Sequence, residues 1–403
     1  MPRMQARVEL VYFDAGGGHR AAAQALREML ALQGRPWDVR LVNLTQVLDP
    51  RQRFRDWTGQ QPEDVYNRRL ARGRTRGMGL ELRLLQWAIR MLHSVLTRPL
   101  VRHWQDSQPD LVVSLIPNFN RVMASALQQA RPGAPFATVI TDLADLPPRF
   151  WVEPDVAQHV IAGTPHAVRQ ALDRGVPAAR VSSVSGMLLR PAFYAPQAAD
   201  RAGARRQAGL DPARPTAAVF YGGQGSEEML RIARELPALQ MVFLTGHNQR
   251  LAEQLRGCSG FAPRVVVGFT PEVPRWLHLA DFFIGKPGPG AMSEALQMGL
   301  PLITFDNADT MPQERWNTRW VRELGVGLVI GSMDELPAAV DALTARLDEF
   351  RSRVRWIDNR AVFEVPQVLA ELLQVSRAMP QVESVRVDHR ASGRDIAWQS
   401  APS

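Results

Sequence analysis

The sequence predicts an α/β protein built from two doubly wound domains, and three observations carry this prediction. Short apolar runs alternate with helical segments through most of the 403 residues. The alternation restarts after a stretch rich in Ala, Arg and Pro at 190–214. Glycine-rich loops follow several of the apolar runs. Strands separated by helices imply crossover connections, and therefore parallel sheets covered on both faces.

The first half supplies one set of alternating elements. An apolar run at 8–13 leads through a glycine loop at 14–18 into an Ala- and Leu-rich helix at 20–32. The later elements are strands at 37–44, 111–115 and 136–140 and a helix at 121–130. Together they predict an N-terminal domain over 1–195.

The second half repeats the pattern and predicts a C-terminal domain over 205–375. Its strand candidates lie at 216–221, 241–244, 265–267, 282–285, 302–305 and 327–330. From 379 the chain is polar and aperiodic, so we expect a loosely ordered tail over 379–403. Ligands of such sheets bind outside the carboxyl ends of the strands, so two facing domains would hold substrates in a cleft between them.

The amino-acid composition indicates the class of protein and its cellular compartment. An apolar fraction of 45% with 22% charged residues is typical of a soluble globular protein. No run of 18 apolar residues occurs and no export signal precedes the first strand, so we expect a cytoplasmic protein. Cys258 is the single cysteine, which excludes an internal disulfide and a metal site built on thiolates.

The net charge of +8 is concentrated in one segment. Between 51 and 104, twelve arginines face four acidic residues. Apolar residues at helical spacing over 80–104, with Arg83, Arg90 and Arg98 between them, predict a basic amphipathic helix. Two interpretations stay open. The helix lies on an anionic membrane surface, or it packs on the core and exposes a solvated arginine face.

Two glycine loops follow predicted strands near the start of each half. The first contains three consecutive glycines, Gly16, Gly17 and Gly18, and places His19 at a helix start. It matches neither the dinucleotide fingerprint nor the P-loop. The second loop, at 221–226, contains Gly223 and precedes two glutamates that would repel a phosphate on that helix. We assign the second loop to the cleft wall, with a simple turn as the alternative.

A third loop, at 286–290, follows an apolar strand and opens a helix. Its backbone N–H groups and the positive end of the helix dipole suit a diphosphate. Lys286, the only lysine of the chain, lies here with Gly288 and Gly290. Glu294 follows about one helical turn later, where a carboxylate accepts hydrogen bonds from a ribose diol. Further on, Gln313 and Glu314 open another helix, either as ligands of sugar hydroxyls or as capping residues.

Several motifs occur in a fixed order along the chain. They are a glycine loop ending in Gly-His-Arg, Thr141-Asp142-Leu143, Gly268-Phe269, a Lys-x-Gly-Pro-Gly-x-x-x-Glu-Ala-Leu segment and a Gln-Glu-x-x-Asn segment. Together they resemble the monogalactosyldiacylglycerol synthases and bacterial diacylglycerol glucosyltransferases of glycosyltransferase family 28. Enzymes that add N-acetylglucosamine to lipid-linked peptidoglycan precursors are related to these. The resemblance runs from about residue 8 to about residue 345.

The resemblance implies a GT-B fold, in which two Rossmann-like domains face each other across a cleft. It also implies inverting transfer of a hexose from a UDP-sugar donor, with neither a metal nor another cofactor. By position, the donor-binding residues are Gly223, Phe269, Lys286, Gly288, Gly290, Glu294, Gln313, Glu314 and Asn317. The acceptor side has the glycines Gly16, Gly17 and Gly18, with His19 and Asp142 as the catalytic candidates.

One position departs from the family pattern and bears on the acceptor. The family often has Thr-Asp-x-x-x-x-His-Pro, whereas Pro147 stands here in place of that His. We expect a membrane lipid acceptor, diacylglycerol or a glycosyl-diacylglycerol, at the inner face of the cell membrane. A peptidoglycan precursor, a soluble acceptor or an epimerase reaction is the alternative.

The sequence leaves open whether His19 or Asp142 is the base. Imidazole suits proton abstraction near neutral pH, and the carboxylate is either its partner or its competitor. A nucleic acid is not expected as a partner, because an arginine-rich binding surface would leave the 286–290 loop without a purpose.

Overall fold

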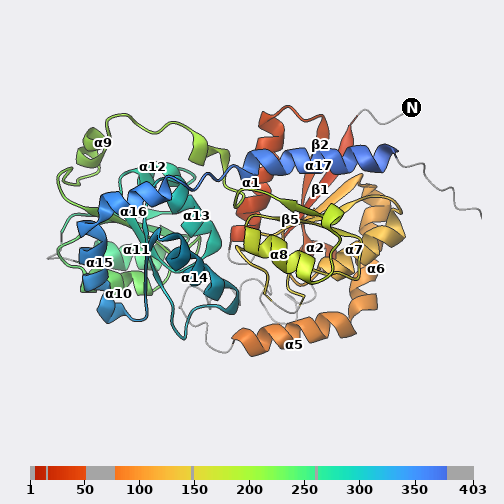
Figure 1. Ribbon diagram of the computed structural model, residues 1–403, viewed down its shortest axis with the longest axis horizontal. Coiled ribbons are helices and arrows are strands. Elements are labelled where there is room, and N and C mark those ends of the chain that lie inside the picture. Colours follow the sequence, from red (N-terminus) through yellow and green to blue (C-terminus); the bar gives the residue numbers. More distant parts are fainter. Residues whose placement is uncertain (1–4, 15–16, 51–77, 147–148, 259–261, 379–403) are drawn as a thin grey trace, which may run out of the picture.

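The computed structural model describes residues 5–14, 17–50, 78–146, 149–258 and 262–378. Figure 1 shows two α/β domains side by side, each with helices on both faces of a central sheet. Each sheet has six strands, and every pairing between them is parallel. The predicted fold class is therefore confirmed. Gly16, Pro147 and the predicted tail at 379–403 lie outside the described residues.

The N-terminal sheet has the order β2-β1-β3-β4-β5-β6. Its strands are β1 (Ala6–Tyr12), β2 (Trp37–Asn43), β3 (Leu111–Ser114), β4 (Phe136–Val139), β5 (Gln158–Ala162) and β6 (Val181–Ser183). Its helices are α1 (Gly18–Leu32), α2 (Leu44–Leu48), α5 (Met78–Met91), α6 (His93–Ser107), α7 (Asn120–Ala130) and α8 (Pro165–Asp173), with short 3₁₀ turns at Ala178–Arg180 and Pro191–Tyr194. The strand order reverses between β1 and β3, so the loops that follow these strands flank a ligand-binding edge.

Local sequence explains these elements. Every residue of β3 and β4 is buried, as continuous apolar runs in a covered parallel sheet require. Helix α1 buries Ala22, Leu26 and Leu30, which recur at helical spacing and join the core that contains β1. Beyond its end, Gly34 takes a φ of 62°. This left-handed conformation favours glycine and lets the chain turn back into β2.

The C-terminal sheet has the order β12-β11-β10-β7-β8-β9, with its switch point between β7 and β10. Its strands are β7 (Thr216–Phe220), β8 (Gln240–Gly246), β9 (Arg264–Gly268), β10 (Phe282–Gly285), β11 (Leu302–Phe305) and β12 (Gly327–Ile330). Its helices are α9 (Arg201–Gln207), α10 (Glu228–Glu235), α11 (Gln249–Arg256), α12 (Val273–His278), α13 (Pro289–Gln297), α14 (Arg315–Leu324), α15 (Leu336–Ala345) and α16 (Leu347–Val354). Short 3₁₀ turns lie at Pro312–Glu314 and Met333–Glu335.

The last helix, α17 (Ala361–Ala378), returns to the N-terminal domain. The range 205–375 was expected to form the C-terminal domain, yet Val365, Leu369 and Leu373 of α17 pack into the core that contains β1 and α1. Figure 1 shows α17 lying across the top of the N-terminal domain beside α1. The chain thus crosses between the domains twice, and sequence periodicity gave no sign of the second crossing.

The two crossings are hydrogen-bonded to each other. Asn359, which is buried, donates from Nδ2 to the carbonyl of Met187 at 3.0 Å. Ser185 donates its backbone N–H to Glu364 Oε2 at 2.7 Å. A Cβ on Gly186 would lie 2.6 Å from the side chain of Asn359, so only glycine fits at this position.

The basic segment differs from the single helix predicted over 80–104. It forms two helices, α5 and α6, which are separated at Leu92. The arginines at 51–76 lie outside the described residues. Figure 1 shows α5 along the lower edge of the N-terminal domain. In the described part of the chain, no helix has both the length and the apolar character needed to cross a bilayer.

A buried carboxylate fastens the base of the C-terminal sheet. Asp281 accepts hydrogen bonds from Arg201, Arg205 and Arg351 at 2.9, 2.6 and 2.7 Å. It also accepts the backbone N–H of Thr216, at the start of β7, at 2.9 Å. Burial alone would raise the pKa of Asp281, but the hydrogen bond from Arg205 and the charge of Arg201 hold it below its ordinary value of 3.8. Helices α9 and α16 are thereby tied to the sheet.

We predict that Asp281→Asn lowers the free energy of unfolding by about 2–4 kcal/mol at pH 7, because it leaves three arginines without their shared anion. A carboxyl with a depressed pKa stabilises the fold above its unfolded pKa and loses this contribution as the pH falls through its folded pKa. The difference between variant and wild type in urea unfolding should therefore narrow only below about pH 4.

Glu349→Gln is the matched control, since its pairs with Arg346 and Arg353 are exposed. This control should change the unfolding free energy much less than Asp281→Asn does. Equal effects of the two substitutions would contradict a structural role for Asp281.

Candidate functional site

The acceptor-side loop ends at the first turn of α1. Gly17 is the N-cap of this helix and takes a φ of 80°, which favours glycine. Among the described residues, no side chain caps the helix start, which leaves its first N–H groups without a side-chain acceptor. His19, which is half-buried, follows in the first turn, and its Nδ1 lies 3.0 Å from Thr141 Oγ1. Two motifs separated by 122 residues thus meet at one point.

Asp142 follows Thr141 and is buried. Its Oδ2 accepts the indole N–H of Trp151 at 2.8 Å. The ring of Trp151 lies edge-on to the His19 ring, with centroids 6.0 Å apart and an interplanar angle of 61°. Both catalytic candidates, His19 and Asp142, therefore contact the side chain of Trp151.

The two candidates differ in protonation. Burial lowers the pKa of His19 to about 4, so its imidazole is neutral at pH 7. Burial raises the pKa of Asp142 to about 7 against the hydrogen bond from Trp151, which lowers it. The charge of Glu314 raises it further, whereas that of Lys286 lowers it. Since Glu314 and Lys286 belong to the C-terminal domain, Asp142 lies within reach of charges from the other domain.

On the donor side, the loop after β10 contains an ion pair. Lys286 Nζ donates to Glu314 Oε1 at 2.9 Å, and the Glu314 side chain is only 4% exposed. Gly288, the N-cap of α13, lies against this pair, where an added Cβ would lie 3.2 Å from Lys286 Cε and 3.5 Å from Glu314 Oε1. The sequence analysis treated Lys286 and Glu314 as ligands of different parts of the donor, and the structure joins them.

The start of α14 is held against the same loop. Asn317 Nδ2 donates to the carbonyl of Pro287 at 2.7 Å, while its buried Oδ1 has no hydrogen-bond partner among the described residues. Gln313 is half-buried, and its Nε2 lies 3.6 Å from the sulfur of Met311. Gly290 lies in the first turn of α13, and an added Cβ there would meet no atom within 4 Å.

Glu294 lies further along α13 and is half-buried. Burial raises its pKa to about 7, and the charge of Arg190 opposes this shift. Arg190 belongs to the first crossing between the domains and donates to the carbonyl of Pro271 at 2.8 Å. The Glu294 carboxyl thus lies where the domain connection meets the donor loops.

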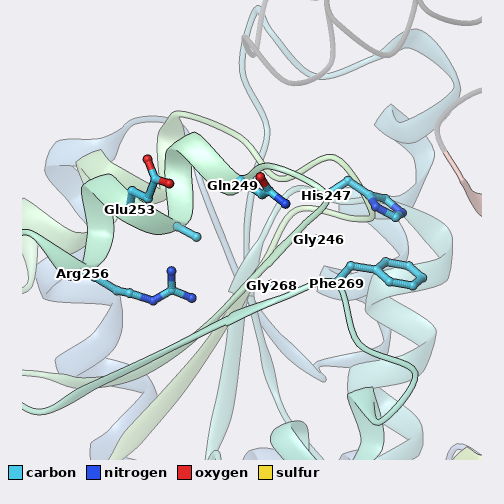
Figure 2. A pocket seen from close by; sticks show the side chains of 8 residues that line it. Gly246, His247, Gln249, Glu253, Arg256, Gly268 and Phe269 are labelled. Atoms are coloured by element: carbon cyan, nitrogen blue, oxygen red, sulfur yellow. The ribbon is translucent and has the colours of Figure 1, made fainter.

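Phe269 lies after β9, apart from the loop at 286–290. It is 67% exposed and stacks on His247 with centroids 4.0 Å apart and planes 17° from parallel. Figure 2 shows this stack at one end of a hollow of about 420 Å³, with Glu253 and Arg256 of α11 at the other end. Gly223 fixes this corner, because its carbonyl accepts the N–H of His247 at 2.9 Å.

The sheet order sets the separation between these parts. Strand β9 is three positions from β10 in the order β10-β7-β8-β9. At about 4.8 Å per strand, Phe269 lies roughly 14 Å across the sheet from the phosphate loop. The candidate residues therefore line an extended edge, with the aromatic pair at one end and the ion pair at the other.

A ring stack joins the two domains at the cleft. His166, at the start of α8, and Trp316, at the start of α14, are parallel, with centroids 4.5 Å apart and planes 7° from parallel. Trp316 is flanked in sequence by residues of the predicted donor-sugar segment. Thr164, the N-cap of α8, donates its hydroxyl to the carbonyl of Leu143, next to Asp142. This stack therefore sets one half of the cleft against the other.

Five residues near the site were not predicted from the sequence: Trp151, His247, His166, Trp316 and Arg190. Trp151 follows Asp142 by nine residues in an aromatic pair with Phe150, and His247 follows a strand within Gly-His-Asn. These sequence contexts were the signals from which Trp151 and His247 could have been predicted as site residues. Among the described residues, no group of three or more His, Cys, Asp or Glu side chains is arranged to hold a metal ion.

Comparison with known proteins agrees with this geometry. Residues 19–186 match the family model of monogalactosyldiacylglycerol (MGDG) synthase. A probable chloroplastic MGDG synthase 2 of Oryza sativa subsp. indica is 28% identical over 392 residues, which cover 91% of this chain and 81% of that protein. The chain is similar to the MGDG synthases. The family resemblance drawn from the sequence is thus confirmed, as is the enzyme class, a glycosyltransferase.

Solved structures support the GT-B fold of this chain. MurG of Acinetobacter baumannii is 13% identical with a TM-score of 0.58, over 91% of this chain and 99% of that chain. Anabaena Alr3699/HepE in complex with UDP-glucose is 14% identical with a TM-score of 0.54, over 92% and 99% of the two chains. At these identities the likeness establishes the fold.

We predict that Asp142→Asn stabilises the protein at pH 8 relative to wild type. A carboxyl whose folded pKa is raised to about 7 contributes stability below its unfolded value near 3.8 and loses it as the pH rises through about 7. Asparagine removes this loss. In urea unfolding the variant should gain about 1–3 kcal/mol on wild type between pH 5 and pH 8.

Asp173→Asn, on the exposed surface of α8, is the control and should follow the wild-type curve at both pH values. Parallel curves for Asp142→Asn and wild type would mean that Asp142 is ionised in the folded protein at pH 5.

Proposed function

We propose that this protein transfers a hexose from a UDP-sugar to a membrane lipid, diacylglycerol or a glycosyl-diacylglycerol, with inversion at the anomeric carbon. The observation that carries the proposal is the meeting of Asp142 and His19 of one domain with Lys286 and Glu314 of the other. Similarity to MGDG synthases supports a lipid acceptor.

The donor fits the edge of the C-terminal sheet. A nucleobase stacks on exposed Phe269, and the diphosphate lies beside Lys286 on the backbone N–H groups of Gly290 and Ala291 in the first turn of α13. Glu294 accepts hydrogen bonds from the ribose diol. Displacement of Lys286 by the diphosphate frees Glu314 for the sugar hydroxyls, which the unpartnered Oδ1 of Asn317 also accepts. No metal is needed, because the cation and the helix dipole meet the diphosphate charge.

The transfer is a single displacement. The acceptor hydroxyl oxygen attacks the anomeric carbon, and the bond from this carbon to the β-phosphate oxygen breaks. The electron pair leaves with UDP, whose added charge is stabilised by Lys286 and the loop amides. The hydroxyl proton passes to Asp142, since a pKa of about 7 matches the operating pH better than the pKa of about 4 of His19. Neutral His19, held by Thr141, orients the acceptor.

The acceptor surface is the exposed face of α5 and the start of α6. Large apolar side chains project there at helical spacing and are 45–66% exposed: Leu84, Leu85, Trp87, Met91, Leu92 and Val95. Arg83, Arg90 and Arg98 are exposed among them. The opposite face anchors the helix, because Ile89 is buried and Gln86 Nε2 donates to Asn118 Oδ1 at 3.0 Å. We infer peripheral docking on an anionic bilayer, at the inner face of the cell membrane.

This arrangement favours one of the two interpretations of the basic segment. A helix packed on the core with a solvated arginine face would bury its apolar residues, whereas α5 exposes them. Transfer to a lipid-linked peptidoglycan precursor or to a soluble acceptor remains the alternative. It is tested by offering these acceptors beside diacylglycerol.

We predict that Glu294→Ala weakens UDP binding about tenfold or more, because the ribose diol loses its carboxyl acceptor. His19→Ala should keep the dissociation constant within about twofold and lower kcat by about 10²-fold or more, since it acts on the acceptor. Calorimetry with UDP, UDP-glucose, UDP-galactose and UDP-N-acetylglucosamine measures binding, and incorporation of labelled sugar into lipid measures turnover.

Glu323→Ala, an exposed acidic residue of the same domain, should leave both quantities unchanged. The proposed donor is wrong if none of the four nucleotides binds the wild-type protein. The reverse pattern, with binding lost in His19→Ala and kept in Glu294→Ala, would exchange the roles of the domains.

We predict that the wild-type protein sediments with liposomes containing anionic phospholipid, and less so at high salt. The triple variant Leu84→Ser, Trp87→Ser, Met91→Ser should lose most of this association and keep UDP binding. Trp356→Ser is the control, because Trp356 is 88% exposed in the C-terminal half of the chain, away from α5. Equal losses in both variants would contradict docking through α5.

A further inference from the structure

We propose that Trp151 is a positioning residue of the transfer reaction, holding the Asp142 carboxyl with its indole N–H and the edge of the His19 ring with its own ring. The inference rests on the proposed function, because it gives a role at the same site to a residue that neither the sequence motifs nor the comparisons assign. Trp151 would keep the base, Asp142, and the orienting group, His19, in fixed positions relative to each other.

The hydrogen bond to Asp142 is fixed from both ends. The Trp151 side chain is 0% exposed, and its indole N–H donates to Asp142 Oδ2 at 2.8 Å. A neutral indole can donate but cannot accept, so this contact directs one carboxyl oxygen and leaves Oδ1 for the substrate. An indole also carries no charge that would compete for the acceptor proton.

The backbone of Trp151 is locked by three side chains. Its N–H donates to Asp145 Oδ1 at 2.9 Å. Its carbonyl accepts from Asn120 Nδ2 and from Gln158 Nε2, both at 2.9 Å. These partners come from the segment after β4, from α7 and from β5, so three elements fix the position of one indole. Arg174 pairs with Asp145 and holds that carboxyl in turn.

The charged groups around Asp142 make its protonation sensitive to the hydrogen bond from Trp151. Glu314 and Asp145 raise its pKa by their charges, and Lys286 lowers it. The indole is the donor that favours the ionised form from within the N-terminal domain. Loss of this donor shifts the balance toward the protonated carboxyl, which cannot accept the proton of the acceptor hydroxyl.

The test is Trp151→Phe, which keeps an aromatic ring and removes the N–H. Trp104→Phe is the matched control, because Trp104 is also 0% exposed and donates to a buried carboxylate, Glu9 Oε2, at 2.9 Å. The acid limb of kcat/KM should move to higher pH by about one to two units in Trp151→Phe only. Its activity should recover toward the wild-type value near pH 9, and UDP affinity should not change.

An unshifted pH profile of kcat/KM in Trp151→Phe, or the same shift in Trp104→Phe, overturns the proposal, since either result means a purely structural role.

A second measurement needs neither substrate nor a folded Trp151 variant. In protein labelled with ¹⁵N-tryptophan, one indole N–H resonance should titrate with a midpoint near pH 7 in wild type and stop titrating in Asp142→Asn. Absence of such a resonance overturns the proposal, whereas absence of transfer with this resonance present is a failure of the proposed function alone.

Discussion

The geometry of the cleft depends on two chain crossings that are tied to each other. Ser185 to Met187 lead out of the N-terminal domain, and Asn359 leads back into α17. The hydrogen bond from Asn359 to Met187 is buried. Gly186 has no Cβ, so its backbone can pack directly against the side chain of Asn359. Because both sheets are parallel, each presents all its carboxyl ends on one edge. Tied crossings keep these two edges, and hence the two sets of loops, facing each other.

Two carboxyls that hold the fold, Asp281 and Glu9, differ from two carboxyls at the site, Asp142 and Glu294, in the direction of their pKa shifts. Asp281 and Glu9 have lowered pKa values because hydrogen bonds and positive charges outweigh their burial. Asp142 and Glu294 have raised values because burial outweighs the opposing groups, which costs stability at neutral pH. Asp145 is also raised, but it receives the Trp151 N–H and pairs with Arg174. Ionising Asp142 and Glu294 in their buried positions destabilises the folded protein, and the rest of the fold must offset this loss. Such carboxyls with raised pKa values are typical of functional sites.

Sequence patterns predicted most strands and the ligand loops because these depend on local signals. Continuous, mostly apolar runs of four residues at β3, β4 and β10 are typical of strands in a covered parallel sheet, and Gly285 ends β10. Two strands were missed. Strand β5 begins with two polar residues, so its apolar run is only three residues long, and β6 is a three-residue edge strand with two serines. The position of α17 was unpredictable because its partner, α1, lies more than 300 residues earlier.

Periodicity could not say which apolar residues of α5 meet the protein, because apolar side chains occur on more than one face of the helix. Leu82 and Ile89 face the core, and Leu84, Trp87 and Met91 face solvent. Only the packing against Asn118 and its neighbours decides between them. The same limit applies to Trp151, whose role depends on Asp142, Asn120 and Gln158 meeting in three dimensions. Sequence motifs thus locate groups that touch substrates, whereas the residues that hold those groups in place emerge only from tertiary contacts, since many different side chains can perform such support.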